Sequence, residues 1–536
     1  MKPIWKILIA AAVIVAVVAA VFIIPHYRAK GAVAAYREQL KRQGEKTTIA
    51  ELVPQLSADE IKAGSEFLAA AAKVGNFTDT PRMMRQLAPG HGLVSWAEEI
   101  SATENSSNCW PPIKKTATEY REASESLCAS LQGPAMVFSV DYSAGFLVPL
   151  TYLSVLKKSS LWLSQETVLA MHERDTNAAW ASLRAEANLM RMNHGEPLLI
   201  SQLVRVAVGQ IAVSTLWEAL QYPGWSEAQL AELQTNWESF DLLDHLESTF
   251  AMERVLGAPE FERMRSSFSN YSSMLNPAFF GGSGPRYDSW REILGNPVEG
   301  IKVHMRYSAW KSWVSYEEEL VTMQAWQAAT ETTRRIHAGG AFAPELKSFQ
   351  LGVTNLLKEH PGWQKRFVFS GENPSGFGEG VGEMASRALQ RISDMENERR
   401  MAVTAIALER FRLRNGKYPV QLQELVPEFL PKTPIDLMDG KPLRYRRRDD
   451  ATFLLYSAGE DGKDDGGDAS PPAEDTSTFK QWYKMRDAVW PMPATPDEVK
   501  KYEAETLQKY SQKWPRGGPL PQPRPVRPPA STTKTN

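Results

Sequence analysis

The sequence predicts a mainly α-helical protein with an N-terminal transmembrane helix, a large all-α body, a small α+β module and a disordered Pro-rich tail. Long stretches carry apolar residues at helical spacing, and short turns rich in Gly, Pro and Asn separate them. Residues 442–447 and 452–457 instead alternate as half-exposed strands do. Because short turns join long amphipathic helices, neighbouring helices are expected to be antiparallel.

Turn and capping signals divide the body into helices. Ser57, followed by Asp59 and Glu60, is a helix-start signal, and Pro223 with Gly224 marks a break. Helices are expected over about 27–75, 114–131, 147–172, 176–192, 197–221, 226–255, 301–336 and 344–358, then over 383–414 and, as a short turn, 420–426.

Composition shifts indicate the domain boundaries. Residues 370–382 are Gly-rich, and the segment from Pro515 to Pro529 carries too little apolar surface to fold. We expect an anchor over 1–28, a helical domain of unknown function over 29–380, a module over 381–492, and a tail over 493–536 with one helix at 496–511.

Residues 7–24 form an uncharged apolar run of eighteen residues, near the lower limit for crossing a bilayer core of about 30 Å. A cleaved signal peptide is the alternative, because residues 18–20 are small enough for a cleavage site. The apolar run continues to Ile24, which favours an uncleaved anchor. Lysine and arginine counts favour a cytoplasmic body, whereas a short basic head before an apolar segment favours export.

Three runs near the C-terminus share an order and spacing. The 383–414 helix ends in LRNGKYP (413–419), DGKPL follows at 439–443, and LYSAGEDGK (455–463) leads into an acidic loop. In these runs, residues 383–490 resemble the C-terminal domain of the type II secretion major pseudopilin. The resemblance implies an α+β module outside the cytoplasm, so we expect a single-pass inner-membrane protein with a periplasmic body.

The N-terminus departs from that family. It lacks the short leader and the Phe-Thr-Leu-x-Glu cleavage motif, so the chain is not expected to polymerise as a pseudopilus subunit. Export permits a disulfide between the two cysteines, Cys109 and Cys128, with two separate thiols as the alternative.

The acidic loop 460–468 is the strongest candidate site. Five acidic side chains among nine residues repel one another unless they are solvated or bind a cation, and three glycines let the backbone curl. Calcium takes six to eight oxygen ligands, and the resemblance implies calcium here, with residues 487–490 closing the site. The candidate ligands are Asp461, Asp464, Asp465, Asp468 and Asp487, and the alternative is a solvated turn without an ion.

Enzyme motifs are incomplete. Pro285 replaces the last Gly of a nucleophile elbow, Glu383 replaces the third Gly of a dinucleotide loop, and the eight histidines are scattered. A net charge of −2 gives no case for nucleic acid. We therefore expect no catalytic residue and an extracytoplasmic structural or interaction protein, associated with a secretion or envelope assembly. The alternatives are an envelope enzyme with its site in the helical body, or a helical binding protein without a secretion role.

Overall fold

A computed structural model describes Trp5, Val13 and residues 24–513, except 78–79, 82, 99–107, 192–194, 276–288, 360–376 and 473–480. Within these ranges the protein is mainly α-helical, as the sequence predicts. Most of the expected span 7–24 and the tail beyond 513 lie outside the described residues. The anchor and the Pro-rich tail therefore stay predictions.

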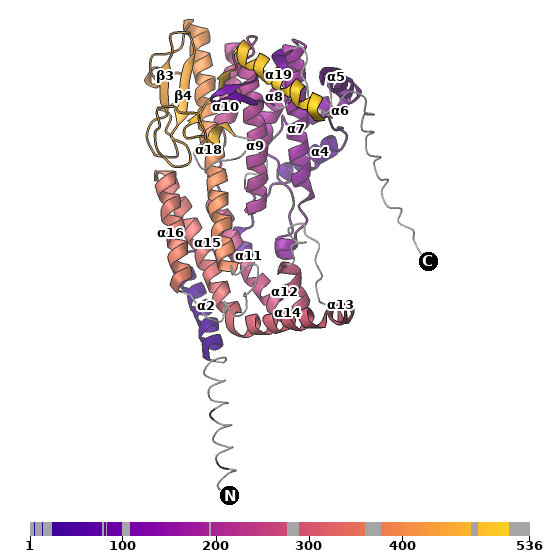
Figure 1. Ribbon diagram of the computed structural model, residues 1–536, viewed down its shortest axis with the longest axis vertical. Coiled ribbons are helices and arrows are strands. Elements are labelled where there is room, and N and C mark those ends of the chain that lie inside the picture. The colour runs from indigo at the N-terminus through magenta and orange to yellow at the C-terminus, as the bar shows by residue number, and fades with distance from the viewer. Residues whose placement is uncertain are drawn as a thin grey trace, which may run out of the picture.

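The body is an elongated bundle (Figure 1), and most of its long helices begin and end close to the expected bounds, although the helix expected to end at 255 continues to Ser266. The bundle helices are α7 (Thr151–His172), α8 (Thr176–Leu189), α9 (Leu199–Leu220), α10 (Glu227–Glu238), α11 (Leu246–Ser266), α15 (Ser315–His337), α16 (Phe342–Glu359) and α18 (Phe377–Asn415). Shorter helices surround them: α2 (Ile24–Arg42), α3 (Ile49–Leu52), α4 (Ala58–Ala71), α5 (Trp110–Glu119), α6 (Arg121–Ser130), α12 (Phe268–Leu275), α13 (Trp290–Gly295) and α14 (Pro297–Ala309).

Local capping explains where several helices begin. The Ser57 side chain accepts a hydrogen bond from the Glu60 amide, and the Glu60 carboxylate accepts one from the Ser57 amide. Ser226 and Gln229 form the same capping box at α10. These signals lie within four residues, which is why the sequence reveals them.

The structure breaks three of the expected helical segments: 27–75 becomes α2, α3 and α4, 114–131 becomes α5 and α6, and 226–255 becomes α10 and α11. His245 has a left-handed backbone with φ of 65° at the start of α11. In the last of these breaks, the Leu242 amide donates to a carboxylate oxygen of Glu396 on α18 at 3.2 Å. Because this contact joins distant segments, no local pattern predicts it.

The C-terminal part contains the two expected strands and one more. β3 (Arg444–Arg447) and β4 (Phe453–Ser457) pair antiparallel, and β5 (Ala488–Val489) adds to β4, giving the order β3-β4-β5. The expected turn at 420–426 is a 3-10 helix, Leu422–Leu425. Together with α18, which packs on β4, this gives a small α+β unit at one end of the molecule.

A second small sheet, which the sequence did not predict, fastens the C-terminal segment to the body. β1 (Gln86–Ala88) and β2 (His91–Gly92) form a hairpin, and β6 (Met492–Pro493) pairs with β2. The fully buried Trp217 of α9 donates from Nε1 to the Pro491 carbonyl at 2.8 Å. Strands of two or three residues carry no readable alternation, so only the long-range pairing reveals them.

The expected tail helix is α19 (Pro496–Lys513), and it packs on the hairpin. The Arg85 guanidinium lies 4.5 Å from the centre of the Tyr502 ring. His91 Nδ1 lies 2.8 Å from a carboxylate oxygen of Glu498. The first turns of the expected tail are thus part of the folded protein.

One continuous cluster of buried side chains joins the body to the α+β unit. It includes Phe250 of α11, Ile406 of α18 and Leu455 of β4. A fragment beginning at residue 381 would leave the apolar surfaces of α18 that face α9, α10 and α15 uncovered. Experiments on the α+β unit therefore need the full chain.

Two further expectations concern cysteines and membrane spans. Cys109 is buried, Cys128 is half-buried, and the two are not joined in a disulfide. Burial, reinforced by Glu166, raises the pKa of the Cys128 thiol to about 12, so this thiol is a poor nucleophile.

Among the described helices, α9 is long and apolar enough to cross a membrane, but most of it is buried inside the bundle, as in a core helix.

Candidate ion-binding sites

A buried carboxylate, Asp487, holds the backbone of the acidic loop. One of its oxygens accepts a hydrogen bond from the Asp465 amide at 3.2 Å, and the other accepts from Gly467 and Asp468 at 2.7 and 3.0 Å. Gly466 and Gly467 have φ of 75° and 86°, which lets successive amides turn toward this side chain. Burial raises the pKa of Asp487, and the three N–H groups oppose that rise.

The exposed acids of the loop each contact a different partner. Asp461 pairs with Lys463 at 2.9 Å, Asp464 with Arg444 at 3.2 Å, and Asp468 lies 3.8 Å from Arg486. Asp464 also accepts from the Tyr456 hydroxyl, and Asp468 from the Ser470 amide. The loop thus brings backbone amides together, while its carboxylates point to separate basic groups.

Arg444 binds three carboxylates beside this loop. Its guanidinium binds the carboxylates of Asp436 and Asp439 as well as that of Asp464. Asp436 is fully buried and also accepts hydrogen bonds from the Ser457 hydroxyl and the Ala458 amide. Sequence reasoning missed Asp436 and Asp439, although the position of Arg444 on a predicted strand beside the acidic loop was a usable signal.

The predicted calcium ligands therefore do not surround one point in this conformation. In the described part of the chain, no loop residue belongs to a group of three or more acidic, histidine or cysteine side chains whose ligand atoms all lie within 4.8 Å of one another. A calcium ion would have to draw Asp461, Asp464 and Asp468 away from Lys463, Arg444 and Arg486. The calcium site stays a prediction, and Lys463, Arg444 and Arg486 would compete with the ion for its carboxylate ligands.

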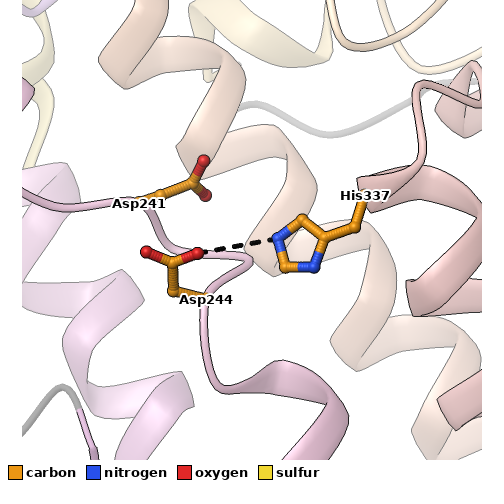
Figure 2. A group of neighbouring side chains, drawn as sticks. All are labelled: Asp241, Asp244 and His337. Carbon is orange, nitrogen blue, oxygen red and sulfur yellow. Dashed lines mark ion pairs between the residues drawn. The ribbon is translucent and has the colours of Figure 1, made fainter.

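A different cluster has converging ligand atoms (Figure 2). Asp241 and Asp244 lie in the break between α10 and α11, and His337 ends α15. One ligand atom from each of the three lies within 4.8 Å of the others, and His337 Nε2 is 3.7 Å from an oxygen of Asp244. Two carboxylates and one imidazole are a ligand set that suits zinc, manganese or iron. Sequence reasoning missed this cluster because the segments are distant and the histidine stands alone.

A buried positive charge influences this Asp–Asp–His cluster. Arg205 of α9 is 3% exposed, its Nη1 donates to Gln202 at 2.7 Å, and its Nε and Nη2 have no hydrogen-bond partner in the structure. Burial lowers the pKa of Arg205 to about 10, while Asp244 and Asp241 oppose that change. The two aspartates thus already act as counter-charges, which weakens their attraction for a metal ion.

Two buried acids on α18 border a small cavity of about 10 Å³, with room for one water molecule. Asp394 and Glu398 lie one helical turn apart, and Glu460 at the start of the acidic loop lines the same cavity. One carboxyl oxygen of Asp394 and one of Glu398 have no hydrogen-bond partner in the structure. Burial raises the pKa of both groups well above their usual range, and each is raised further by a neighbouring acid.

Comparison of the chain with protein-family models, curated proteins and solved structures gives no match. The resemblance of residues 383–490 to the major pseudopilin therefore stays a prediction.

Replacing Asp487 with Ala is expected to destabilise the protein by about 1–3 kcal/mol, because three partly buried hydrogen bonds from loop amides lose their acceptor. Asp461→Ala, which removes an exposed carboxylate from the same loop, should change stability by less than about 1 kcal/mol. Urea unfolding of the full chain in detergent measures both. Equal midpoints for the two variants would show that Asp487 does not hold the loop.

Proposed function

We propose that the protein is a membrane-anchored structural or interaction protein that presents an acidic, calcium-binding loop at the end of its body farthest from the membrane. One observation carries this proposal. Helix α2 begins at Ile24, the last residue of the apolar run 7–24, whereas β3 and β4 lie at the opposite end of the molecule (Figure 1). α18, with 39 residues and a length of about 58 Å, runs along the bundle toward that end.

Because the body and the α+β unit share one core, the bundle can act as a rigid spacer between the membrane and the acidic loop. α18 packs on α9, α10, α15 and α16 and then continues into the α+β unit without a linker. A loop carried by such a unit is held at a fixed height and orientation, which suits docking to a partner. By resemblance, we propose that the partner belongs to a secretion or envelope assembly and that the body is periplasmic. A reporter fused at the C-terminus that is active only in the cytoplasm would overturn this topology.

Calcium binding is supported by the chemistry of the loop. Asp461, Asp464 and Asp468 are about half exposed. Lys463 and Arg486, the partners of Asp461 and Asp468, are exposed, whereas Arg444, the partner of Asp464, is mostly buried. Exposed ion pairs contribute about 0–1 kcal/mol each, so a divalent cation can displace them. Asp487 and the left-handed glycines Gly462, Gly466 and Gly467 keep the backbone of the loop curled.

Calcium is expected to raise the unfolding midpoint of the full chain in detergent relative to chelator. At one hundred times its dissociation constant, the ion should add about 2.7 kcal/mol. The double variant Asp461→Ala, Asp465→Ala should lose the gain, and Asp497→Ala, an exposed acid of α19, should keep it. A calcium response in neither the unmodified chain nor Asp497→Ala would contradict the ion site.

A metal-dependent envelope enzyme is the second candidate function, and the convergence of Asp241, Asp244 and His337 is what favours it. A metal ion held by these three residues would lower the pKa of a bound water molecule and so activate it as a nucleophile. Elemental analysis of the purified chain should then find a transition metal that is lost in His337→Ala. Purified chain that takes up no zinc or manganese would remove this candidate.

A further inference from the structure

Helices α13 and α14 carry an apolar stripe that no described part of the protein covers. Leu294, Val298, Ile301 and Met305 are 73%, 65%, 56% and 60% exposed. Val298, Ile301 and Met305 follow helical spacing, so they lie on one face of α14, and Leu294 precedes them on α13. Four exposed aliphatic side chains in a row are unusual on a surface that faces only water.

The opposite face of α14 is fixed to the body. The Tyr307 hydroxyl donates to the Met264 and Arg265 carbonyls at 3.3 and 3.1 Å, and the His304 ring stacks on Phe268 at 3.8 Å. Gly300 lies against Ile293, where a Cβ would approach within 3.1 Å. The stripe is therefore the outward face of a packed helix.

The position of α14 points to what covers the stripe. α13 and α14 cross the base of the molecule, roughly perpendicular to the bundle, at the end where α2 begins (Figure 1). His26 Nδ1 of α2 lies 2.9 Å from the Ser312 carbonyl, just after α14. Lys30 of α2 lies 6.0 Å from the ring of Tyr316. The stripe is thus at the level where the apolar run 7–24 meets the body.

Charge complements the apolar stripe. Five exposed basic side chains accompany it at the base: Arg28, Lys30, Arg291, Lys302 and Lys311. Glu299 pairs with Lys302 at 3.6 Å and offsets part of this charge. Tyr27 is 66% exposed, and tyrosine favours the boundary between hydrocarbon and headgroups. Apolar side chains flanked by lysine and arginine are typical of a helix that lies in a membrane interface.

We propose that α13 and α14 lie in the headgroup region of the bilayer that holds residues 7–24, with their apolar stripe against the acyl-chain segments next to the headgroups and their basic side chains on lipid phosphates. This rests on the proposed function, because it takes residues 7–24 as the anchor. A single helix leaves the body free to tilt. A second contact at α14 fixes the bundle upright and keeps the acidic loop away from the membrane.

Fluorescence quenching of the full chain in liposomes tests the surface. Ile301→Cys is labelled with an environment-sensitive fluorophore, and Lys463→Cys in the acidic loop is the matched control at the far end. The unsubstituted protein, with Cys109 buried and Cys128 half-buried, reports background labelling. Quenchers attached to lipid acyl chains should reduce emission at 301 several-fold more than at 463, and aqueous iodide should do the reverse.

Liposomes with and without phosphatidylglycerol define the role of charge. Anionic lipid should increase the lipid quenching at 301, and Lys302→Gln with Lys311→Gln should reduce that increase while leaving quenching at 463 unchanged. Iodide quenching at 301 equal to that at 463 would overturn the proposal. Shielding of 301 from both quenchers would also overturn it, since a protein would then cover the stripe. Carbonate extraction distinguishes failure of this proposal from failure of the anchor. A chain that carbonate extracts from the liposomes has no membrane span and contradicts the proposed function itself.

Discussion

Replacing Glu396 with Ala is expected to cost about 3–5 kcal/mol of stability, the range for removing one partner of a buried ion pair. Glu396 is fully buried on α18 and binds Arg399 through both oxygens, each at 2.8 Å. It also binds Arg400 at 2.8 Å and accepts from the Leu242 amide. Without Glu396, the buried guanidinium of Arg399 has no counter-charge at this position. The Leu242 amide, in the break between α10 and α11, also loses its acceptor.

Glu383→Ala is the matched control. Glu383 lies on the same helix and pairs with Arg387, but both side chains are more than 60% exposed. Such a pair is worth less than about 1 kcal/mol. Unfolding midpoints of the two variants in detergent should therefore differ clearly, and a loss in Glu396→Ala no larger than in Glu383→Ala would contradict the structural role assigned to Glu396.

The same pair predicts a pH dependence. Burial opposes ionisation of Glu396, but Arg399 and Arg400 hold its pKa below the usual range. An acid whose pKa is lowered by folding contributes stability above the unfolded value of about 4.3, and that stability is lost as the pH falls through the lowered folded value. In Glu396→Ala, the acid limb of the stability profile should be shallower than in the unmodified chain.

Local signals account for what the sequence predicted. The capping box at Ser57 and the alternation in 442–457 act over a few residues, and the structure confirms the helix and strands that they predict. The break at 239–245, the pairing of β2 with β6 and the extra strand β5 depend on contacts between distant segments. Tertiary packing decides such elements, so periodicity in one segment does not reveal them.

The candidate sites also divide into one that is contiguous in the sequence and others that form only in the folded chain. The acidic loop is contiguous, so its acids and glycines are visible in the sequence, and the resemblance supplied Asp487. The structure then shows that Asp487 binds amides, while Arg444 takes three carboxylates. The Asp–Asp–His cluster and the cavity lined by Asp394, Glu398 and Glu460 assemble only in three dimensions.

Replacing Glu398 with Gln is expected to stabilise the protein by about 1–3 kcal/mol at neutral pH, the cost of an unsatisfied buried polar group. Glu398 is 2% exposed, one of its oxygens has no hydrogen-bond partner in the structure, and Asp394 lies one turn away. Gln keeps the size of the side chain and removes the ionisation. Gln also adds two N–H donors that face the carboxyl groups of the cavity.

The pH dependence of stability shows whether ionisation of Glu398 stabilises or destabilises the protein. Folding raises the pKa of Glu398, first by burial and then by Asp394. An acid with a raised folded pKa destabilises the protein progressively as the pH rises from about 4.3 to the raised value. The gain from Glu398→Gln should therefore be smallest near pH 4 and should grow toward pH 7. Glu383→Gln, on the exposed face of the same helix, should show no such trend. A loss of stability in Glu398→Gln at pH 7 would contradict this account and would mean that the ionised carboxylate is stabilised by a cation, for which Lys484 is the candidate, because its charge opposes the rise in the pKa of Glu398.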